Sequence, residues 1–421
     1  MRCVGDYRTT CIHRPARRSV TGLMKTRFTH SFTQQAPIPD EAIEAAVRVM
    51  QSGRLHRYNT AADEVAETAL LEQEFAELMG ARYCLAVASG GYALATAMRA
   101  IGVQPGDPVL TNAFTLAPVP GAIASLGAVP VYIGVTPDLV IDLEDLAAKA
   151  NQSKVLLLSH MRGHIADMDA LMALCERAGI SVIEDCAHTM GAHWNGRASG
   201  RWGRMGCFST QTYKHINSGE GGLLVSDDDE AMARATMLSG SYMLYGRHLA
   251  GPPAEVFDRI KYDTPNISGR MDNVRAALLR PQLKTLPAHC AQWNQRYRTV
   301  EAGLRDVAGL VLIERPAAEG FVASSFQFRV PNWTDATVYE LVKRCADRGV
   351  ELKWFGAAEP VGFTSRYDSW RYAPVEPMPK TDAILKSIID LRLPLTFSLE
   401  DCQLLATIIA EEVRELYAET Q

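Results

Sequence analysis

Short apolar runs alternate with helical segments through the first half of this 421-residue sequence, and no other feature constrains the fold as strongly. Each run is apolar at consecutive positions, as expected of a strand buried on both of its faces. The strand-like runs are residues 84–88, 108–111, 129–133, 155–159, 180–184, 206–211 and 222–226. Helices such as the one expected over 168–178 separate them, which is typical of a parallel sheet covered on both sides. We therefore predict an α/β fold with a large three-layer domain and a mostly parallel sheet.

The pattern changes near Pro281, where isolated strands and longer helical segments replace the regular alternation. The expected strands are residues 310–313 and 326–330, and the expected helices are 278–297, 336–348, 381–389 and 399–417. Isolated strands among helices indicate an α+β arrangement. We predict a large domain over residues 27–280 and a smaller C-terminal α+β domain over residues 281–421.

One further helix is expected before the first strand, over residues 40–51. Pro39 is a start signal for a helix and Gly53 is a stop signal. The apolar side of this helix should be formed by Ile43, Ala46, Val47 and Met50.

Residues 1–26 differ from the rest in composition, with six basic side chains, one acid and no apolar core of a secretory signal. We expect a disordered extension here, or translation that starts at Met24 instead of Met1. The whole chain carries a net charge of -5 and no apolar run near the roughly 20 residues that cross a bilayer. These properties argue against nucleic-acid and membrane partners.

The nine cysteines are scattered and none forms a CxxC pair, which argues against a structural zinc site or another metal. An odd number of cysteines without a secretory signal is typical of reduced thiols. We therefore expect a cytoplasmic protein without a metal site.

The most specific chemistry lies between residues 184 and 222. Asp185 follows an apolar strand, so it lies where the carboxyl end of a parallel strand meets a ligand. His188 comes three residues later, and Lys214 lies in a glycine-bounded loop between two strands. Pyridoxal 5'-phosphate needs a lysine for its aldehyde, a carboxylate for its ring nitrogen and hydroxyl or backbone donors for its phosphate. The residues of this stretch match those needs.

The phosphate donors are expected at residues 89–92, away from the GEGG run at 219–222. No GxxxxGK[ST] order surrounds that run and no helix follows it, so it is not a phosphate loop. Gly90, Gly91 and Tyr92 instead lead from a strand into a helix. The N–H groups at a helix start favour an anion.

These residues together resemble the DegT/DnrJ/EryC1/StrS family, which comprises sugar aminotransferases of pyridoxal-phosphate fold type I. The resemblance covers nearly the whole chain from about residue 28. It rests on EDCAH at 184–188 and on the spacing FSxxxxKxxxxGEGG at 208–222. Other similar stretches are SGRLHRY from Ser52, HMRGHIADMDAL from His160, GRMDNVRAALLRPQL from Gly269 and MPKTDAILKSIIDLRLPL from Met378.

The resemblance implies a role for single residues. The family's Schiff-base lysine falls on Lys214 and its ring-nitrogen aspartate falls on Asp185. The partner of the ring oxygen, often glutamine in the family, is His188 here, and the phosphate-binding serine is Ser209. The threonine that usually opens the phosphate-binding helix is replaced by Gly91, so backbone donors are left for that role.

Two further positions depart from the family's pattern. The aromatic residue that stacks on the cofactor ring falls on Leu116, with Phe114 two positions away. An asparagine contributed across the dimer interface falls nearest Ser268, with Asn266 close by. Both departures concern the shape of the pocket and therefore the substrate.

The activity implied is a ping-pong transamination from glutamate or glutamine to a keto sugar, free or nucleotide-linked, or to a cyclitol ketone. His160, Arg162 and Arg270 are candidates to bind the donor carboxylate, although structural ion pairs would explain them equally well. The family also implies a homodimer with its active site at the subunit interface.

Three alternatives stay open. Some relatives replace the lysine by histidine and catalyse a dehydration, and Lys214 argues against that activity here. Another enzyme with the same cofactor, such as a lyase or an aromatising synthase, would need the same residues. A non-catalytic regulator that binds the cofactor is the third reading, and the sequence shows no separate DNA-binding module to support it.

Overall fold

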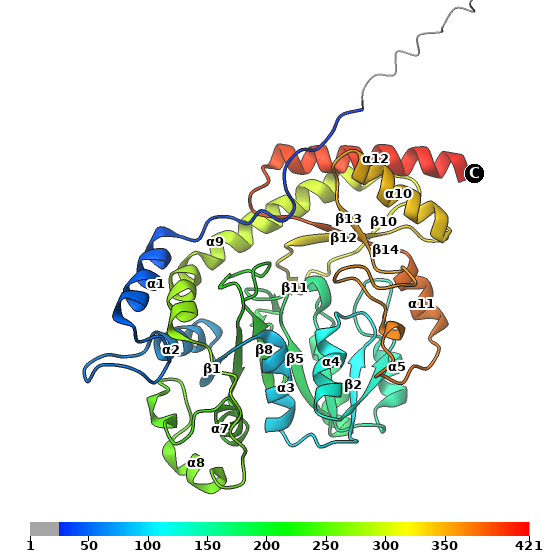
Figure 1. Ribbon diagram of the computed structural model, residues 1–421. Helices are drawn as coiled ribbons and strands as arrows, with labels where there is room; N and C mark the ends of the chain where they lie inside the picture. Colours follow the sequence, from blue (N-terminus) through cyan, green and yellow to red (C-terminus); the bar gives the residue numbers. More distant parts are fainter. Residues whose placement is uncertain (1–24, 421) are drawn as a thin grey trace, which may run out of the picture.

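The computed structural model describes residues 25–420, and its centre is a seven-stranded sheet between two layers of helices (Figure 1). In spatial order the strands are β1 (Tyr83–Val87), β9 (Gly222–Ser226), β8 (Met205–Ser209), β5 (Ser181–Asp185), β4 (Val155–Ser159), β2 (Pro108–Asn112) and β3 (Val129–Ile133). Five of them, from β8 to β3, run parallel, whereas β9 is antiparallel to both of its neighbours. The predicted α/β class with a large, mostly parallel sheet is confirmed.

Both faces of this sheet are buried, which explains why its strands are apolar at consecutive positions. On β5, for example, Val182 belongs to one core and Ile183 belongs to the core on the opposite face. The helices of the first core are α2 (Glu67–Met79), α6 (Met168–Ala178) and the start of α9 (Asn273–Leu304). The helices of the second core are α3 (Gly90–Ala100), α4 (Pro118–Ser125) and α7 (Asp229–Leu238).

Helix α6 shows how local signals set these boundaries. The carboxylate of Asp167 accepts the N–H of Ala170, and this side-chain cap begins the helix. Gly179 ends it with a φ of 65°, a left-handed conformation that glycine adopts without steric cost. The observed helix has the bounds that were predicted from the sequence.

A second, four-stranded sheet is formed by the C-terminal part of the chain and is antiparallel throughout. Its order is β10 (Val311–Leu312), β12 (Ser325–Arg329), β14 (Ile388–Arg392) and β13 (Leu352–Trp354), and its helices include α10 (Asp335–Asp347) and α12 (Leu399–Thr420). The helix predicted over 381–389 is wrong in its last part, because α11 (Pro379–Lys386) ends before β14 begins. The β-branched residues Ile388 and Ile389 are fully buried in the strand, a position that suits such side chains.

The long helix α9 connects the two sheets and passes through Pro281 and Pro287 without a break. Its contacts change along its length, from α1 (Asp40–Ser52) and α2 to α12. The domain boundary predicted after residue 280 falls within this helix. The change of composition at Pro281 thus lies inside a continuous element.

The start of the chain packs on the second sheet. Phe28 and Phe32 are buried in the same core as Phe397, with ring centroids 4.9 and 5.0 Å from that residue. Of the extension predicted over residues 1–26, residues 1–24 lie outside the described residues, as does the alternative start at Met24. Within residues 25–420, no helix is long and apolar enough to cross a membrane.

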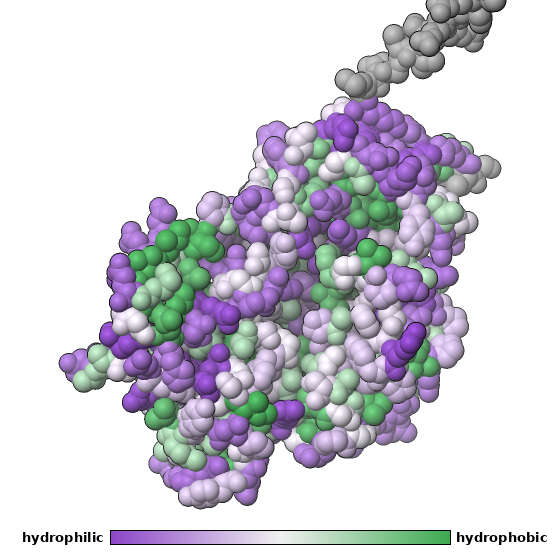
Figure 2. All heavy atoms as spheres, in the orientation of Figure 1, coloured by the Kyte–Doolittle hydropathy of each residue, from purple (hydrophilic) through white to green (hydrophobic). Residues whose placement is uncertain are grey.

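Helix α1 forms as predicted but turns a different side toward the protein. Ala42, Ala45 and Ala46 are buried, whereas Ile43, Val47 and Met50 are exposed by 46, 38 and 52%. Of the predicted apolar side only Ala46 is buried, and the helix packs against α9. Figure 2 shows hydrophobic atoms gathered where Figure 1 places α1.

Candidate active site

A cavity of about 480 Å³ lies at the carboxyl ends of β4, β5 and β8, where open α/β sheets bind ligands. The first sheet and its loops contribute Ser89, Ser159, Asp185, Ser209 and Lys214, and the C-terminal part of the chain contributes Ser325, Phe363 and Arg392. Because both parts of the molecule supply lining residues, neither could form this cavity alone. All four sequence-predicted polar residues of the 184–222 stretch, His188 included, therefore meet here with a serine of the 89–92 turn.

The loop between β8 and β9 carries Lys214 into the cavity. A backbone turn from Gln211 to Lys214 folds the loop, and Gly219 adopts a φ of 79° on its return. The lysine is partly buried, and its Nζ lies 2.9 Å from Nε2 of His188. Loss of solvent around the amine and, to a lesser degree, the positive charge of Arg162 lower the pKa of Lys214 to about 7, although the carboxylate of Asp185 acts in the opposite direction. A substantial fraction of this amine is therefore uncharged near neutral pH.

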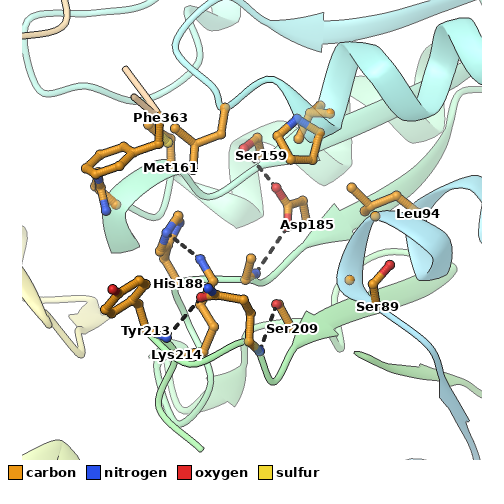
Figure 3. A pocket seen from close by; sticks show the side chains of 18 of the residues that line it. Ser89, Leu94, Ser159, Met161, Asp185, His188, Ser209, Tyr213, Lys214 and Phe363 are labelled. Atoms are coloured by element: carbon orange, nitrogen blue, oxygen red, sulfur yellow. Dashed lines mark hydrogen bonds between the residues drawn. The ribbon is translucent and has the colours of Figure 1, made fainter. Parts of the chain in front are cut away.

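Asp185 ends β5 and points into the cavity beside the lysine (Figure 3). One carboxylate oxygen accepts the N–H of Ala187 at 3.1 Å, and the other accepts the hydroxyl of Ser159 at 3.2 Å. Burial raises the pKa of Asp185, although these two hydrogen bonds and the charge of Lys214 act in the opposite direction. A fixed negative group thus lies at the base of the cavity.

His188 lies between this carboxylate and the outer loops. Burial lowers its pKa well below the ordinary value, and the nearby charges of Lys214 and Arg162 lower it further. The imidazole is therefore neutral at physiological pH. A neutral imidazole can form a hydrogen bond with the neighbouring amine of Lys214, and it does not repel that amine when the amine is protonated.

The turn before α3 forms one end of the cavity. The hydroxyl of Ser89 accepts the N–H of Tyr92 at 3.1 Å and so begins the helix. A Cβ on Gly90 would lie 2.8 Å from Cβ of Ser209, so only glycine allows these two segments to approach so closely. The first N–H groups of a helix have no acceptor within it, and because Ser89 accepts that of Tyr92, the N–H groups of Gly90 and Gly91 are left for an anion.

The opposite end of the cavity is aromatic and basic. Figure 3 shows Phe363 and Tyr213 on the side away from Ser89, with Lys214 and His188 between the two ends. Arg162 and Arg392 line this end as well. This end of the cavity is thus aromatic and carries two cations.

Arg162, a candidate from the sequence to bind the donor carboxylate, lines the cavity in an unusual backbone conformation. It lies in a single helical turn, Met161–Gly163, with a φ of 55°, which is uncommon for a residue other than glycine. The guanidinium is buried, lies 3.1 Å from the carboxylate of Asp390 and stands 4.8 Å from the ring centre of Phe363. Its charge is therefore already compensated by a buried acid.

Several predicted residues do not line the cavity of this chain. Phe114 packs against Phe355 in a neighbouring core, with ring centroids 5.2 Å apart, whereas Leu116 does line the cavity. The hydroxyl of Tyr92 donates to the backbone oxygen of Leu238. Only the backbone of Tyr92 is close to the turn that would hold a phosphate.

The remaining predicted residues are engaged elsewhere. The side chain of Asn266 accepts the N–H of Tyr242, and Ser268 accepts a hydrogen bond from Arg270. His160 lies 3.1 Å from the buried carboxylate of Glu184. None of the four predicted side chains, Asn266, Ser268, Arg270 and His160, lines the cavity.

Glu184 also belongs to the single group of metal-ligating residue types found among residues 25–420, together with His160 and Cys186. Its two oxygens already accept the N–H groups of Gly200, Trp202 and Gly203. The carboxylate therefore orders the 200–203 turn, and the cluster has a structural explanation that involves no ion.

Three residues that line the cavity were not predicted from the sequence: Arg392, Tyr213 and Phe363. Arg392 was hidden by the helix predicted over 381–389, since its strand was not recognised. On a strand, Asp390 and Arg392 point to the same face, because side chains two positions apart do so. Two charged residues at this spacing were the sequence signal that could have indicated the strand. Phe363 lies in an irregular loop, where no periodicity reports on its position.

Comparisons with known proteins point to one family. A model of the DegT/DnrJ/EryC1/StrS aminotransferase family matches residues 37–410. The chain is 31% identical to the 3-amino-5-hydroxybenzoate synthase of Amycolatopsis mediterranei over 378 residues, 86% of this chain and 92% of that protein. The crystal structure of a 3-amino-5-hydroxybenzoic acid synthase superposes with a TM-score of 0.78 at 28% identity, covering 91% of this chain and 98% of that one.

A third relative is a putative L-glutamine:3-amino-2,3-dideoxy-scyllo-inosose aminotransferase of Micromonospora echinospora. It is 32% identical over 255 residues, which span 59% of this chain and 58% of that protein. These similarities thus point to one family, and the names of the relatives indicate two kinds of product.

Proposed function

Because the chain belongs to the DegT/DnrJ/EryC1/StrS aminotransferase family and is a pyridoxal-phosphate-dependent aminotransferase, we propose that it transfers an amino group from glutamine or glutamate to a keto sugar or a cyclitol ketone. The name of the Micromonospora relative, which specifies L-glutamine and an inosose, supports this choice of donor and acceptor. The observation that carries the proposal is a Lys214 whose pKa is lowered to about 7, in the same cavity as Asp185 and 2.9 Å from a neutral His188.

The residues of the cavity fit pyridoxal phosphate in charge and in shape. Lys214 would hold the aldehyde, Asp185 the ring nitrogen and His188 the ring oxygen. The phosphate would lie at the turn of Gly90 and Gly91, where the absence of a Cβ leaves room and the helix start offers N–H donors. Ser209, which contacts that turn, adds a hydroxyl.

The cofactor, when bound, supplies an electron sink that stabilises negative charge on the reacting carbon of the substrate. With the cofactor held by the donor's amino group, the amine of Lys214 would be free to take the proton from that carbon and to deliver it to the former aldehyde carbon. Its pKa of about 7 leaves a substantial fraction of the amine uncharged for this task near pH 7. Asp185 would keep the ring nitrogen protonated, and the hydrogen bonds from Ala187 and Ser159 hold its carboxylate in place.

The second half of the reaction runs the same proton transfer in reverse on the keto acceptor. Lys214 would return the proton to the acceptor carbon, and the aromatic end of the cavity would accommodate the ring of the sugar or cyclitol. Phe363 and Tyr213 suit this role, because aromatic faces pack well against ring substrates.

A second candidate function is the synthesis of an aromatic amine. The Amycolatopsis relative, which aligns with 86% of this chain, carries the name of such a synthase and favours this reading. Such an enzyme would use the same cavity residues on a carbocyclic acid. The two functions differ in product, since only the synthase would create a new aromatic ultraviolet absorption.

We also propose a homodimer with the two cavities at the interface. The exposed apolar side of α1 and the segment near Tyr242 and Met243 support it, since both leave large apolar side chains in solvent. Arg247 of that segment donates to the backbone oxygen of Tyr58, which links the segment to the region after α1. Asn266, which accepts the N–H of Tyr242, and the nearby Ser268 would then approach the phosphate of the partner's cofactor.

We also propose that the protein is cytoplasmic. The seven cysteines that the structure describes are all buried and free of disulfide bonds, which supports a reducing compartment.

The test of the transferase proposal is the visible spectrum of the purified protein loaded with pyridoxal phosphate. A yellow band should appear and bleach when L-glutamine or L-glutamate is added, and Lys214→Ala should lack the wild-type band. Bleaching reports that the amino group has moved to the cofactor. A yellow protein that no amino acid bleaches would contradict the aminotransferase proposal.

A further inference from the structure

Arg392 is a cation of the cavity that has no acidic partner. It lies on strand β14 and lines the aromatic end of the cavity, beside Tyr213 and Phe363. No carboxylate among residues 25–420 lies within 4.0 Å of its guanidinium. Arg162, its neighbour at that end, differs in this respect because Asp390 lies 3.1 Å away. A partly buried guanidinium without a counter-ion marks a place where the protein leaves room for an anion.

The side chain of Arg392 is held in place by aromatic rings. Its guanidinium carbon lies 3.9 Å from the ring centre of Tyr213 and 5.6 Å from that of Phe363. Stacking on two rings restricts the planar group without using its N–H donors. These donors remain free to bind a planar anion, and Tyr213 directly precedes Lys214 in the chain.

The anion cannot be the phosphate of the cofactor under the arrangement above. Ser89 and the glycine turn lie at the other end of the cavity, with Lys214 and His188 between (Figure 3). An anion at Arg392 therefore belongs to the substrate. Arginine matches the two oxygens of a carboxylate with two parallel hydrogen bonds.

We propose that Arg392 binds a carboxylate of the substrate and so orients it toward Lys214. This inference rests on the proposed aminotransferase function. Two sources would provide the carboxylate: the α-carboxylate of the amino donor, or a carboxylate on the ring of the acceptor. Arg162 acts as a fixed positive neighbour whose charge is compensated by Asp390, so the selective contact is made by Arg392.

The experiment compares Arg392→Met and Arg392→Lys with the wild-type enzyme loaded with pyridoxal phosphate. Bleaching of the yellow band is measured against L-glutamine concentration and against 4-aminobutanamide, which is glutamine without its α-carboxylate. If the donor supplies the carboxylate, Arg392→Met lowers kcat/KM for glutamine by about 10- to 100-fold, mainly through KM. The slow reaction of 4-aminobutanamide stays unchanged, and Arg392→Lys lies between.

The acceptor arm uses the amino form of each enzyme with 3-oxocyclohexanecarboxylate and with cyclohexanone. If the acceptor supplies the carboxylate, Arg392→Met slows the return of the yellow band with the first ketone only. Arg305→Met is the matched control, because it removes an exposed arginine at the end of α9, away from the cavity. Thermal unfolding of each variant shows whether the fold is retained.

Binding of glutarate, an unreactive dicarboxylate, provides a readout that does not depend on turnover. Calorimetry should give a Kd for Arg392→Met at least about 10-fold weaker than for the wild type. Equal glutarate affinity and equal kinetics in both arms would overturn the inference. A wild-type protein that no donor bleaches would instead contradict the proposed function, and the glutarate result would still decide the role of Arg392.

Discussion

At the scale of single residues, the chemistry of Lys214 is set by its neighbours rather than by its loop. A lysine in a polar, glycine-bounded loop is ordinarily solvated and charged, yet here the side chain is partly buried against His188 with Asp185 nearby. Burial and the positive charge of Arg162 remove the proton that water would leave in place. The reactive form of the amine is therefore a consequence of packing.

Asp185→Asn should reduce turnover strongly while leaving the fold intact. Asparagine keeps the size of the side chain but loses the negative charge opposite the ring nitrogen, so we expect kcat to fall by at least about 100-fold. Ser159→Ala is the graded comparison, because it removes only one hydrogen bond to the carboxylate and should have a much smaller effect. Steady-state kinetics measure both, and near-wild-type turnover by Asp185→Asn would contradict the assigned role.

The lowered pKa of Lys214 predicts how stability depends on pH in the cofactor-free protein. Between about pH 7 and pH 10.5, the unfolded chain binds a proton at this lysine that the folded chain does not bind. The unfolding free energy of the wild type therefore rises with pH in this window, by up to about 1.4 kcal/mol per pH unit relative to Lys214→Met. Below this window the lysine is protonated in both the folded and the unfolded chain, so its contribution to the unfolding free energy no longer changes with pH.

Urea unfolding of both proteins at pH 7.5 and pH 9.5 measures this difference. Lys214→Met should be the more stable protein at the lower pH, and its advantage should shrink at the higher pH. Lys284→Met, which changes an exposed lysine, should show no such trend. A constant difference between wild type and Lys214→Met would mean that the lysine is charged in the folded protein.

At the scale of elements, α1 and β14 show two ways in which an apolar pattern is ambiguous. The apolar side of α1 was recognised, but the chain buries the alanines and leaves Ile43 and Met50 in solvent. The apolar run before Arg392 was assigned to a helix, but it forms a strand between β12 and β13. In both cases the partner surface, which the sequence does not display, decides the outcome.

The exposed side of α1 predicts a change of oligomeric state on substitution. Ile43→Glu combined with Met50→Glu places two charges in the proposed interface, so the dimer should dissociate to monomers. Light scattering after size-exclusion chromatography measures the mass. Leu399→Glu, an exposed apolar position at the start of α12, serves as the control and should remain dimeric. An unchanged mass for the double variant would exclude α1 from the interface.

At the scale of the whole molecule, the active site is a product of two sheets that meet. The first sheet supplies the groups that would hold the cofactor, and the C-terminal part supplies Phe363 and Arg392 for the substrate. Helix α9 runs through both parts and fixes their relative position by its contacts with α2 and α12. Changes to the acceptor preference should therefore map to the C-terminal part of the chain.

The sequence by itself determined the fold class and predicted the residues that are proposed to hold the cofactor. Each of the seven strands is a run of neighbouring residues, and the spacing from Asp185 to Lys214 follows from one strand, its crossover and the next loop. Such features are local, because periodicity, helix caps and turn residues depend on positions a few residues apart. The same holds for the glycine turn before α3, where Ser89 begins the helix.

Only the tertiary structure decided which side chains face the cavity. Phe114 and Leu116 are two residues apart, yet only Leu116 lines the cavity, and His160 is paired with Glu184 instead of facing a substrate. Arg392 lies 178 positions after Lys214 and reaches the cavity through the packing of β14 beside Arg162 and Tyr213. The physical reason is that contacts between distant segments depend on the fit and charge of surfaces, and a linear pattern does not contain them.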